Sequence, residues 1–269
     1  MFVLIKIKNI VLDILFPPIC LNCQKYLNRA YRQANQPRNF ICNDCYSSIR
    51  LNSSLFCPVC RLRLADNKKI CGHADYLLGA AGDYDDPILR NLIHYFKYES
   101  FENLTPILGE IIIKYIENCK LKIENYIVVP VPLHRVKERQ RGFNQAKLLA
   151  EYIVPKIFGC QTSDEHPTFQ YFGRPTSEYL KIVNALKRIK NTKPQACLRR
   201  QAQCKNNESR TENIKNCFKI KDSTIESIKN KNILLIDDVF TSGATVNEAV
   251  KILKQNNARK IIALVMAKA

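Results

Sequence analysis

The sequence of 269 residues lacks any uninterrupted apolar run that could cross a membrane, because a spanning helix needs about 20 apolar residues. Residues 1–18 are rich in apolar side chains, but Lys6, Lys8 and Asp13 interrupt them. No small-residue cleavage site follows, which argues against a secretory signal peptide. We expect an amphipathic helix there that packs on the body of a cytoplasmic protein. Attachment of this helix to a membrane surface is the alternative.

Acidic residues are also scarce, with 24 Asp and Glu against 42 Lys and Arg and a net charge of +18. A surplus of this size favours polyanionic partners such as nucleic acid, pyrophosphate or anionic lipid. Apolar residues make up 46% of the chain, enough for a packed core, so wholesale disorder is excluded.

Cysteine, in contrast, is abundant and unevenly distributed. Seven of the 12 cysteines lie in residues 20–71, and six of these form three Cys-x-x-Cys pairs. A cytoplasmic protein is not expected to hold a disulfide framework, so this spacing points to metal. The first two pairs, Cys20 with Cys23 and Cys42 with Cys45, are 18 residues apart. Two such turns present four thiolates to one tetrahedral zinc ion, which predicts a Cys₄ zinc ribbon.

Strands and helices alternate after residue 78. The apolar patterns predict strands at residues 78–84, 126–133, 233–236 and 260–266, and helices at residues 87–98, 105–119, 145–157 and 246–255. This alternation predicts an α/β domain with a mostly parallel sheet. Residues 181–231 are less regular and contain 14 basic and four acidic residues. We interpret this stretch as a solvated insertion, with a DNA-binding segment as the alternative.

Residues 233–245, ILLIDDVFTSGAT, form the most specific motif. Asp237 and Asp238 follow a strand predicted to be buried on both faces, at the end where ligands bind in open α/β sheets. The loop of small residues then enters a helix, and its N–H groups suit a phosphate dianion. The loop residues are Thr241, Ser242, Gly243, Ala244 and Thr245. The alternative is an ordinary strand, turn and helix in which an Asp caps the helix.

A second anion site is predicted at residues 129–145, VPVPLHRVKERQRGFNQ. A strand leads into a loop with clustered basic residues, and a helix begins near Asn144. Guanidinium groups bind phosphate in a bidentate manner, so we assign pyrophosphate binding to Lys137, Arg139 and Arg141. A solvated basic loop is the alternative, and His134 fits either a strand end or a ligand contact.

The motif at residues 233–245 resembles the phosphoribosyl pyrophosphate (PRPP) motif of type I phosphoribosyltransferases. Together with residues 129–145, LIHYFKY at residues 92–98 and LFPPICLNC at residues 15–23, it resembles the ComF/GntX family over most of the chain. The resemblance implies that Asp237 and Asp238 contact the ribose hydroxyls and that the loop holds the 5′-phosphate. It also implies Mg²⁺ on the pyrophosphate.

The same resemblance implies a double zinc ribbon. Its second site would use Cys57, Cys60 and Cys71, but Ala74 stands where the family has a fourth cysteine. His73 is the nearby substitute, and a Cys₃His site is chemically acceptable. Otherwise the second site is weakened or lost and its cysteines simply pack.

We therefore expect a helix at residues 1–18, a double zinc ribbon at residues 19–78 and a phosphoribosyltransferase-like domain at residues 79–269, with basic insertions at about 160–210. The family resemblance implies a role in DNA uptake during natural transformation. That role entails binding of single-stranded DNA and of partners such as a DNA-uptake helicase or other competence proteins. An active phosphoribosyltransferase of nucleotide or nucleobase metabolism, with no DNA role, is the alternative. The sequence does not identify an acceptor base.

Overall fold

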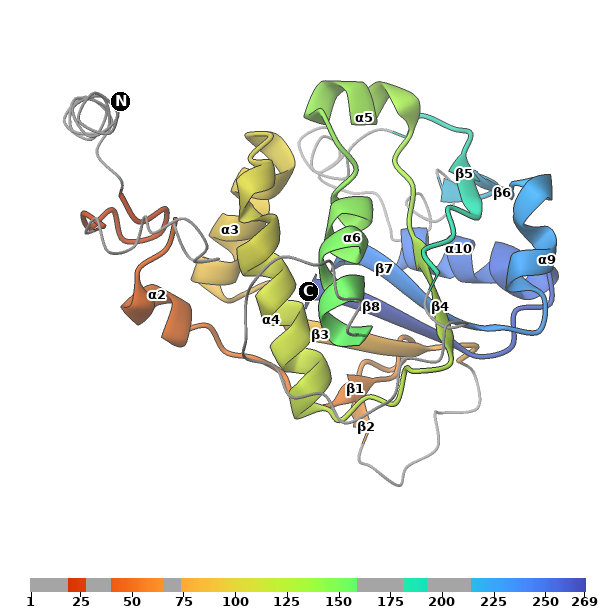
Figure 1. Ribbon diagram of the computed structural model, residues 1–269, viewed down its shortest axis with the longest axis horizontal. Helices are drawn as coiled ribbons and strands as arrows, with labels where there is room; N and C mark the ends of the chain where they lie inside the picture. Colours follow the sequence, from red (N-terminus) through yellow and green to blue (C-terminus); the bar gives the residue numbers. More distant parts are fainter. Residues whose placement is uncertain (1–18, 28–39, 65–73, 159–180, 193–213) are drawn as a thin grey trace, which may run out of the picture.

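The computed structural model describes residues 19–27, 40–64, 74–158, 181–192 and 214–269. Its centre is a six-stranded sheet with the order β2-β1-β3-β8-β7-β4 (Figure 1). The strands are β1 (Leu55–Phe56), β2 (Arg63–Leu64), β3 (Leu77–Asp83), β4 (Tyr126–Pro130), β7 (Asn232–Phe240) and β8 (Ile261–Lys268). Strands β3, β8, β7 and β4 are parallel, as predicted, and β1 and β2 add an antiparallel edge.

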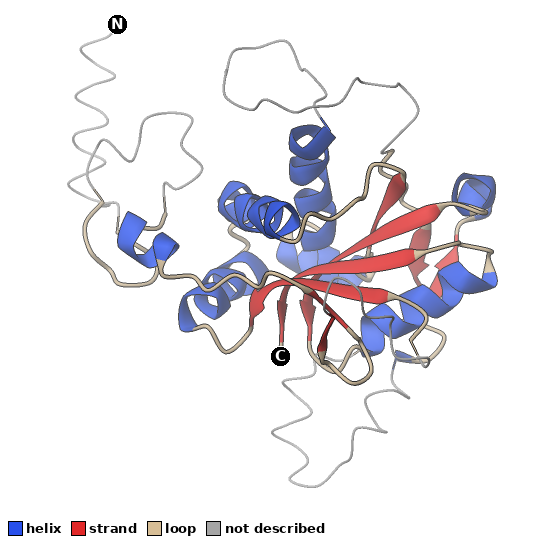
Figure 2. Ribbon diagram, turned by 90° about the horizontal axis from the view of Figure 1, so that it is seen from below, coloured by secondary structure: helices blue, strands red, loops and turns tan. Residues whose placement is uncertain are grey.

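Helices cover both faces of this sheet (Figure 2). The longer helices are α3 (Pro87–Tyr98), α4 (Thr105–Asn118), α6 (Gln145–Phe158) and α10 (Ala244–Gln255). Successive residues of β7 point to opposite faces, so Leu234 and Ile236 pack with α3, α4 and α6, whereas Ile233 and Leu235 pack with α10. Burial on both faces explains why this strand is a continuous apolar run.

Strand β7 extends beyond the four residues that the sequence predicted. Asp237, Val239 and Phe240 continue the parallel pairing with β8. The acid pair therefore lies within the last part of the strand and not after it. The pairing of Pro130 with Ile236 brings the end of β4 beside this part of β7.

The basic segment that we predicted as a loop is a helix, α5 (Arg135–Arg141). His134 caps it, because its Nδ1 accepts a hydrogen bond from the amide of Val136 at 3.3 Å. Gly142 ends it in the left-handed conformation, with φ of 82°. None of the α5 residues is fully buried, so the helix has no apolar periodicity for sequence reasoning to detect.

The basic stretch at residues 181–231 is not a purely solvated insertion. Its described parts include two strands, β5 (Leu186–Arg188) and β6 (Phe218–Ile220), which pair antiparallel, and the short helical elements η3 (Asp222–Thr224) and α9 (Ile225–Ile228). Leu186 and Phe218 are buried in the core that contains α10. Beside the sheet, the amide of Val183 donates to the carbonyl of Val128 on β4 at 2.8 Å.

The cysteine-rich region is joined to the sheet. Strands β1 and β2 lie within residues 55–64 and pair beside β3, so strand pairing crosses the division expected at residue 78. The short helices α2 (Asn43–Ser47) and η2 (Glu102–Leu104) complete the described elements. Residues 1–18, Cys71, His73 and most of the predicted insertions lie outside the described residues. Within the described part, no helix is long and apolar enough to span a membrane.

Candidate functional site

The acid pair at the end of β7 is partly buried and held by cations from other elements. Burial, together with the neighbouring carboxylate of Asp238, raises the pKa of Asp237 to about 7, although Lys97 and Arg188 oppose the shift. Lys97 Nζ lies 2.9 Å from Asp238 Oδ1, and the two side chains are only 15% and 16% exposed. Two carboxylates this close favour positive charge or hydroxyl donors.

Lys97 was not among the predicted site residues. It lies in the last turn of α3, whose N-cap Asp86 accepts hydrogen bonds from two amides of the first turn. The apolar side of α3 is buried against the core, and this packing places Lys97 next to Asp238 of β7. The motif at residues 92–98 pointed to this segment, but only tertiary packing shows which side chain meets the acid pair.

The loop after β7 is a tight turn built around Gly243. Gly243 adopts φ of 79°, and a Cβ there would lie 2.5 Å from Cζ of Phe240, so glycine is required on two grounds. Gly243 is the N-cap of α10, and its carbonyl accepts the amide of Asn247 at 2.8 Å. Thr241, Ser242 and Thr245 are partly buried around it. A helix N-terminus entered through small residues favours an anion.

Helix α5 presents two of the three predicted pyrophosphate residues together. Lys137 and Arg141 are four residues apart and share one side of the helix, whereas Arg139 lies on another side and is exposed. Burial, helped by Arg188 and Arg141, lowers the pKa of Lys137 to about 8. The Arg141 guanidinium lies 5.5 Å from the ring centre of Tyr98 at the end of α3.

Gln145 connects α5 to α3 beneath the site. Its Oε1 accepts a hydrogen bond from Arg141 at 3.1 Å, and its Nε2 donates to the carbonyl of Phe96 at 3.3 Å. Asn144 caps α6 by accepting the amide of Ala146 at 3.1 Å, and it donates to the carbonyl of Val131. The residues at 141–145 therefore fix the position of α5 relative to α3 and β4.

Arg188 on β5 is a further cation that sequence reasoning missed. Its guanidinium lies 5.4 Å from the ring centre of Phe218, and its Nη2 donates to Thr192 Oγ1 at 2.6 Å. Its Nε is buried without a hydrogen-bond partner among the residues that the structure describes. The charge of Arg188 acts on both Asp237 and Lys137, so β5 contributes to the same site as α5 and β7.

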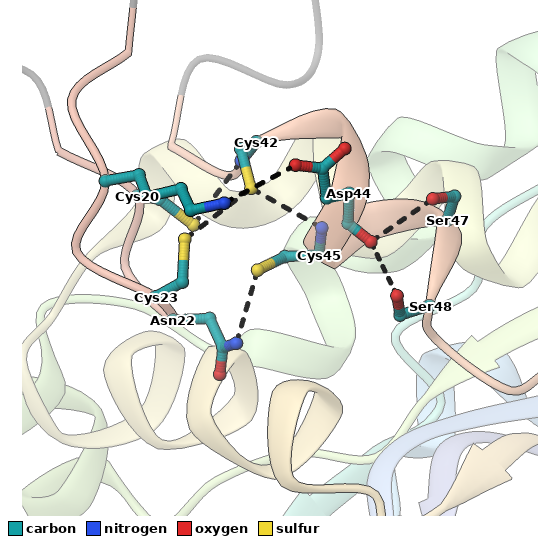
Figure 3. Close-up of polar contacts among 9 residues, drawn as sticks. Cys20, Asn22, Cys23, Cys42, Asp44, Cys45, Ser47 and Ser48 are labelled. Atoms are coloured by element: carbon teal, nitrogen blue, oxygen red, sulfur yellow. Dashed lines mark hydrogen bonds and ion pairs between the residues drawn. The ribbon is translucent and has the colours of Figure 1, made fainter.

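The first two cysteine pairs come together in space, as predicted. The sulfur atoms of Cys20, Cys23, Cys42 and Cys45 all lie within 4.8 Å of one another (Figure 3). In the first turn, the amide of Gln24 donates to the carbonyl of Cys20 at 2.9 Å, and Gln24 has φ of 59°. Cys42 caps α2 and accepts the amide of Cys45 at 3.4 Å.

The environment of these cysteines suits a zinc ion. Burial raises the pKa of Cys45 to about 12. Burial acts in the same direction on Cys20, but amide donors from Cys23, Cys42 and Asn22 outweigh it and lower the pKa of Cys20 to about 7. Four sulfurs at this separation cannot all be thiolates without a cation between them, and zinc supplies that charge in tetrahedral thiolate sites.

Cys57 and Cys60 lie in a turn with the same backbone pattern. The amide of Arg61 donates to the carbonyl of Cys57 at 2.9 Å, and Arg61 has φ of 59°, as Gln24 does in the first turn. The other predicted ligands of the second site, Cys71 and His73, lie outside the described residues. This second site therefore stays a prediction.

Comparison with known proteins yields two family models and several relatives. A double zinc ribbon domain matches residues 11–74, and a phosphoribosyl transferase domain matches residues 182–269. Competence protein F of Haemophilus influenzae is 27% identical over 90% of this chain and 93% of its own length. DNA utilization protein YhgH of Escherichia coli is 25% identical over 82% and 87%. Competence protein ComFC of Bacillus subtilis is 22% identical over 81% and 79%. Together, the two matched domains and these relatives support the resemblance to the ComF family.

The two matched domains contribute strands to one sheet, in which β3 lies between them. The double zinc ribbon match contains both described cysteine turns, and the phosphoribosyl transferase match contains Arg188, the acid pair and the loop after β7. Lys97, Lys137 and Arg141 lie between the two matches in the sequence. The structure nevertheless brings Lys97 against Asp238 and places the charge of Arg188 beside Lys137.

Proposed function

We propose that this protein binds a PRPP-type ligand with Mg²⁺ at the end of β7. The main support for this proposal is the partly buried pair Asp237 and Asp238. The glycine-capped loop follows their strand, and cations from α3 and β5 lie near the two carboxylates. In this proposal the ribose hydroxyls donate to the two carboxylates. The 5′-phosphate accepts from the N–H and hydroxyl groups of residues 241–245.

The pyrophosphate of the ligand would lie toward α5 and β5. Lys137, Arg141 and Arg188 converge there, and burial already disfavours the charged form of Lys137. An anion would restore that charge and pair with the guanidinium groups. Mg²⁺ would neutralise the remaining charge of the pyrophosphate, because this hard divalent cation binds phosphate oxygens.

We further propose that the protein acts in DNA uptake and binds single-stranded DNA. The relatives that cover most of the chain are named for competence and for DNA utilization. The net charge of +18 suits a polyanion. Tyr98 is 56% exposed beside Arg141 and offers a ring on which a base can stack. Partners such as a DNA-uptake helicase or other competence proteins belong to this proposal.

An active phosphoribosyltransferase of nucleotide or nucleobase metabolism is the second candidate. The acid pair, the glycine-capped loop and the cations of α5 and β5 support transfer from PRPP as a reaction at this site. Fold and ligand site do not by themselves establish a reaction. Release of pyrophosphate from PRPP in the presence of single nucleobases would distinguish this candidate from a binding protein.

Calorimetric titration of PRPP and Mg²⁺ into the zinc-loaded protein tests the ligand proposal. We expect saturable binding to the wild type and its loss in Asp237→Asn/Asp238→Asn. The matched control is Asp222→Asn/Glu226→Gln, which removes two acids near η3 and α9 and should bind as the wild type does. Absence of binding to the folded wild type, or equal binding by the Asp237/Asp238 variant, would contradict the proposal.

A further inference from the structure

Arg61, in the turn formed by the second cysteine pair, reaches the loop that follows β7. Its Nη2 donates to the carbonyl oxygen of Thr241 at 2.9 Å, and its Nη1 donates to the carbonyl oxygen of Ala269 at 2.7 Å. Thr241 is the first residue of the proposed 5′-phosphate loop. A planar guanidinium can make both bonds at once because its N–H groups point in fixed directions.

The turn that carries Arg61 is itself well defined. The amide of Cys57 donates to the carbonyl of Leu62 at 3.0 Å, and the amide of Arg61 donates to the carbonyl of Cys57 at 2.9 Å. Arg61 takes φ of 59°, a left-handed conformation that is uncommon for non-glycine residues. The direction of the Arg61 side chain is thus set by the cysteine turn.

Three further contacts connect the residues around this turn to the same part of the sheet. Lys268 Nζ lies 4.6 Å from the ring centre of Phe56, the residue before Cys57, and 2.6 Å from Asp83 Oδ1. Tyr76, whose pKa is raised by burial and by Cys57, donates from its hydroxyl to Asn247 Oδ1 in the first turn of α10. The turn, the end of β8 and the start of α10 therefore form one connected group.

We infer that Arg61 is a positioning residue for the 5′-phosphate loop. By binding the carbonyl of Thr241, it holds the first peptide of the loop in one orientation and keeps the following N–H groups directed at the phosphate. The turn at Cys57 and Cys60 is then part of the ligand site, although none of its side chains touches the ligand. The inference rests on the proposed ribose-phosphate site and adds the residue that shapes it.

The experiment uses three variants of the full zinc-loaded chain. Arg61→Asn removes the guanidinium with a residue that tolerates the left-handed backbone. Arg61→Lys keeps the charge but replaces the two guanidinium nitrogens that bind the two carbonyls with a single ammonium nitrogen. Gln24→Asn is the matched control, because Gln24 occupies the equivalent position in the first turn and also has φ of 59°. The measurements are zinc content, amide exchange of residues 238–248 without ligand, and calorimetry with ribose-5-phosphate and with pyrophosphate.

We expect Arg61→Asn to accelerate amide exchange in residues 238–248 and to weaken ribose-5-phosphate binding by about tenfold. Pyrophosphate binding and zinc content should stay within twofold of the wild type. Arg61→Lys should be intermediate, and Gln24→Asn should match the wild type in every measurement. This pattern would support a role in positioning the loop, distinct from a general role in stability.

Unchanged exchange and unchanged ribose-5-phosphate affinity in both Arg61 variants would overturn the inference. Equal losses for ribose-5-phosphate and pyrophosphate would overturn it as well, because they would indicate general destabilisation. If Arg61→Asn does not fold, Arg61→Lys carries the test alone. A wild type that binds no ribose-5-phosphate would contradict the proposed function, while the exchange measurement would still decide whether Arg61 orders the loop.

Discussion

At the scale of single residues, the carboxyl of Asp237 is the most unusual group in the site. Burial and the adjacent Asp238 raise its pKa to about 7, whereas an ordinary Asp has a pKa of ~4. At pH values between these two pKa values, Asp237 is ionised in the unfolded chain but still protonated in the folded chain. Ionising Asp237 therefore costs folding free energy as the pH rises through this window.

Asp237→Asn should for this reason stabilise the ligand-free protein, and more at pH 8 than at pH 5. We expect a difference between the two pH values of at least ~1 kcal/mol in the free energy of unfolding. Denaturant unfolding in Mg²⁺-free buffer at both pH values measures it. A variant that is less stable than the wild type at pH 8 would show that Asp237 contributes more through its hydrogen bonds than it costs through its charge. Whereas the stability of the wild type falls as the pH rises, its affinity for PRPP should increase, because the ionised Asp237 is the better acceptor for the ribose hydroxyls.

The residues of this site were predictable from the sequence to different degrees. The sequence predicted Asp237, Asp238 and the loop, because strand, acids and small residues follow one another in the chain. Lys97 and Arg188 were not predicted. Their roles depend on where α3 and β5 pack, and an isolated Lys or Arg in a basic sequence carries no local signal.

At the scale of elements, α5 divides its basic residues between two sides. Lys137→Ala and Arg141→Ala should each weaken pyrophosphate binding by about tenfold, since a hydrogen bond to a charged group contributes roughly 1.5–3 kcal/mol. Arg139→Ala should change it less than threefold, because Arg139 lies on another side and is exposed. Calorimetry with pyrophosphate and Mg²⁺ compares the three variants. An equal loss in Arg139→Ala would mean that the whole helix, and not one side of it, meets the anion.

The first zinc site gives a second prediction at this scale. Cys42→Ser should remove one equivalent of zinc per chain and lower the melting temperature, because Cys42 supplies a ligand and also caps α2. Cys119→Ser is the control, since Cys119 lies at the end of α4, outside the cysteine cluster. Unchanged metal content and melting in Cys42→Ser would contradict the zinc assignment.

Elements with strong apolar periodicity were predictable, and short ones were not. Helix α3 has the predicted bounds, and the predicted helix at residues 145–157 differs from α6 by one residue. Strands β1 and β2 have two residues each, too few for any alternation to be visible. Their pairing beside β3 is decided by the cysteine turn between them, so the sequence could not show that the cysteine-rich region continues the sheet.

At the scale of the whole molecule, the net charge of +18 makes a prediction about salt. Binding of single-stranded DNA should weaken on the order of a hundredfold between 50 and 200 mM salt if about five phosphates are contacted. Fluorescence anisotropy with a labelled oligonucleotide at several salt concentrations measures the slope. Lys137→Ala/Arg141→Ala should reduce that slope if the strand follows α5. DNA binding that is insensitive to salt, or absent, would favour the phosphoribosyltransferase alternative.

The order of the strands also affects how the chain is made. Strand β3 lies between β1, which precedes it in the sequence, and β8, which follows it much later; Asp83 and Lys268 are 185 residues apart. During synthesis on the ribosome, one edge of β3 therefore has unpaired backbone groups until the residues of β8 have emerged. Such edges promote aggregation, and sheets that depend on distant pairings fold slowly. We expect low temperature and slow expression to raise the yield of folded protein more than added zinc does.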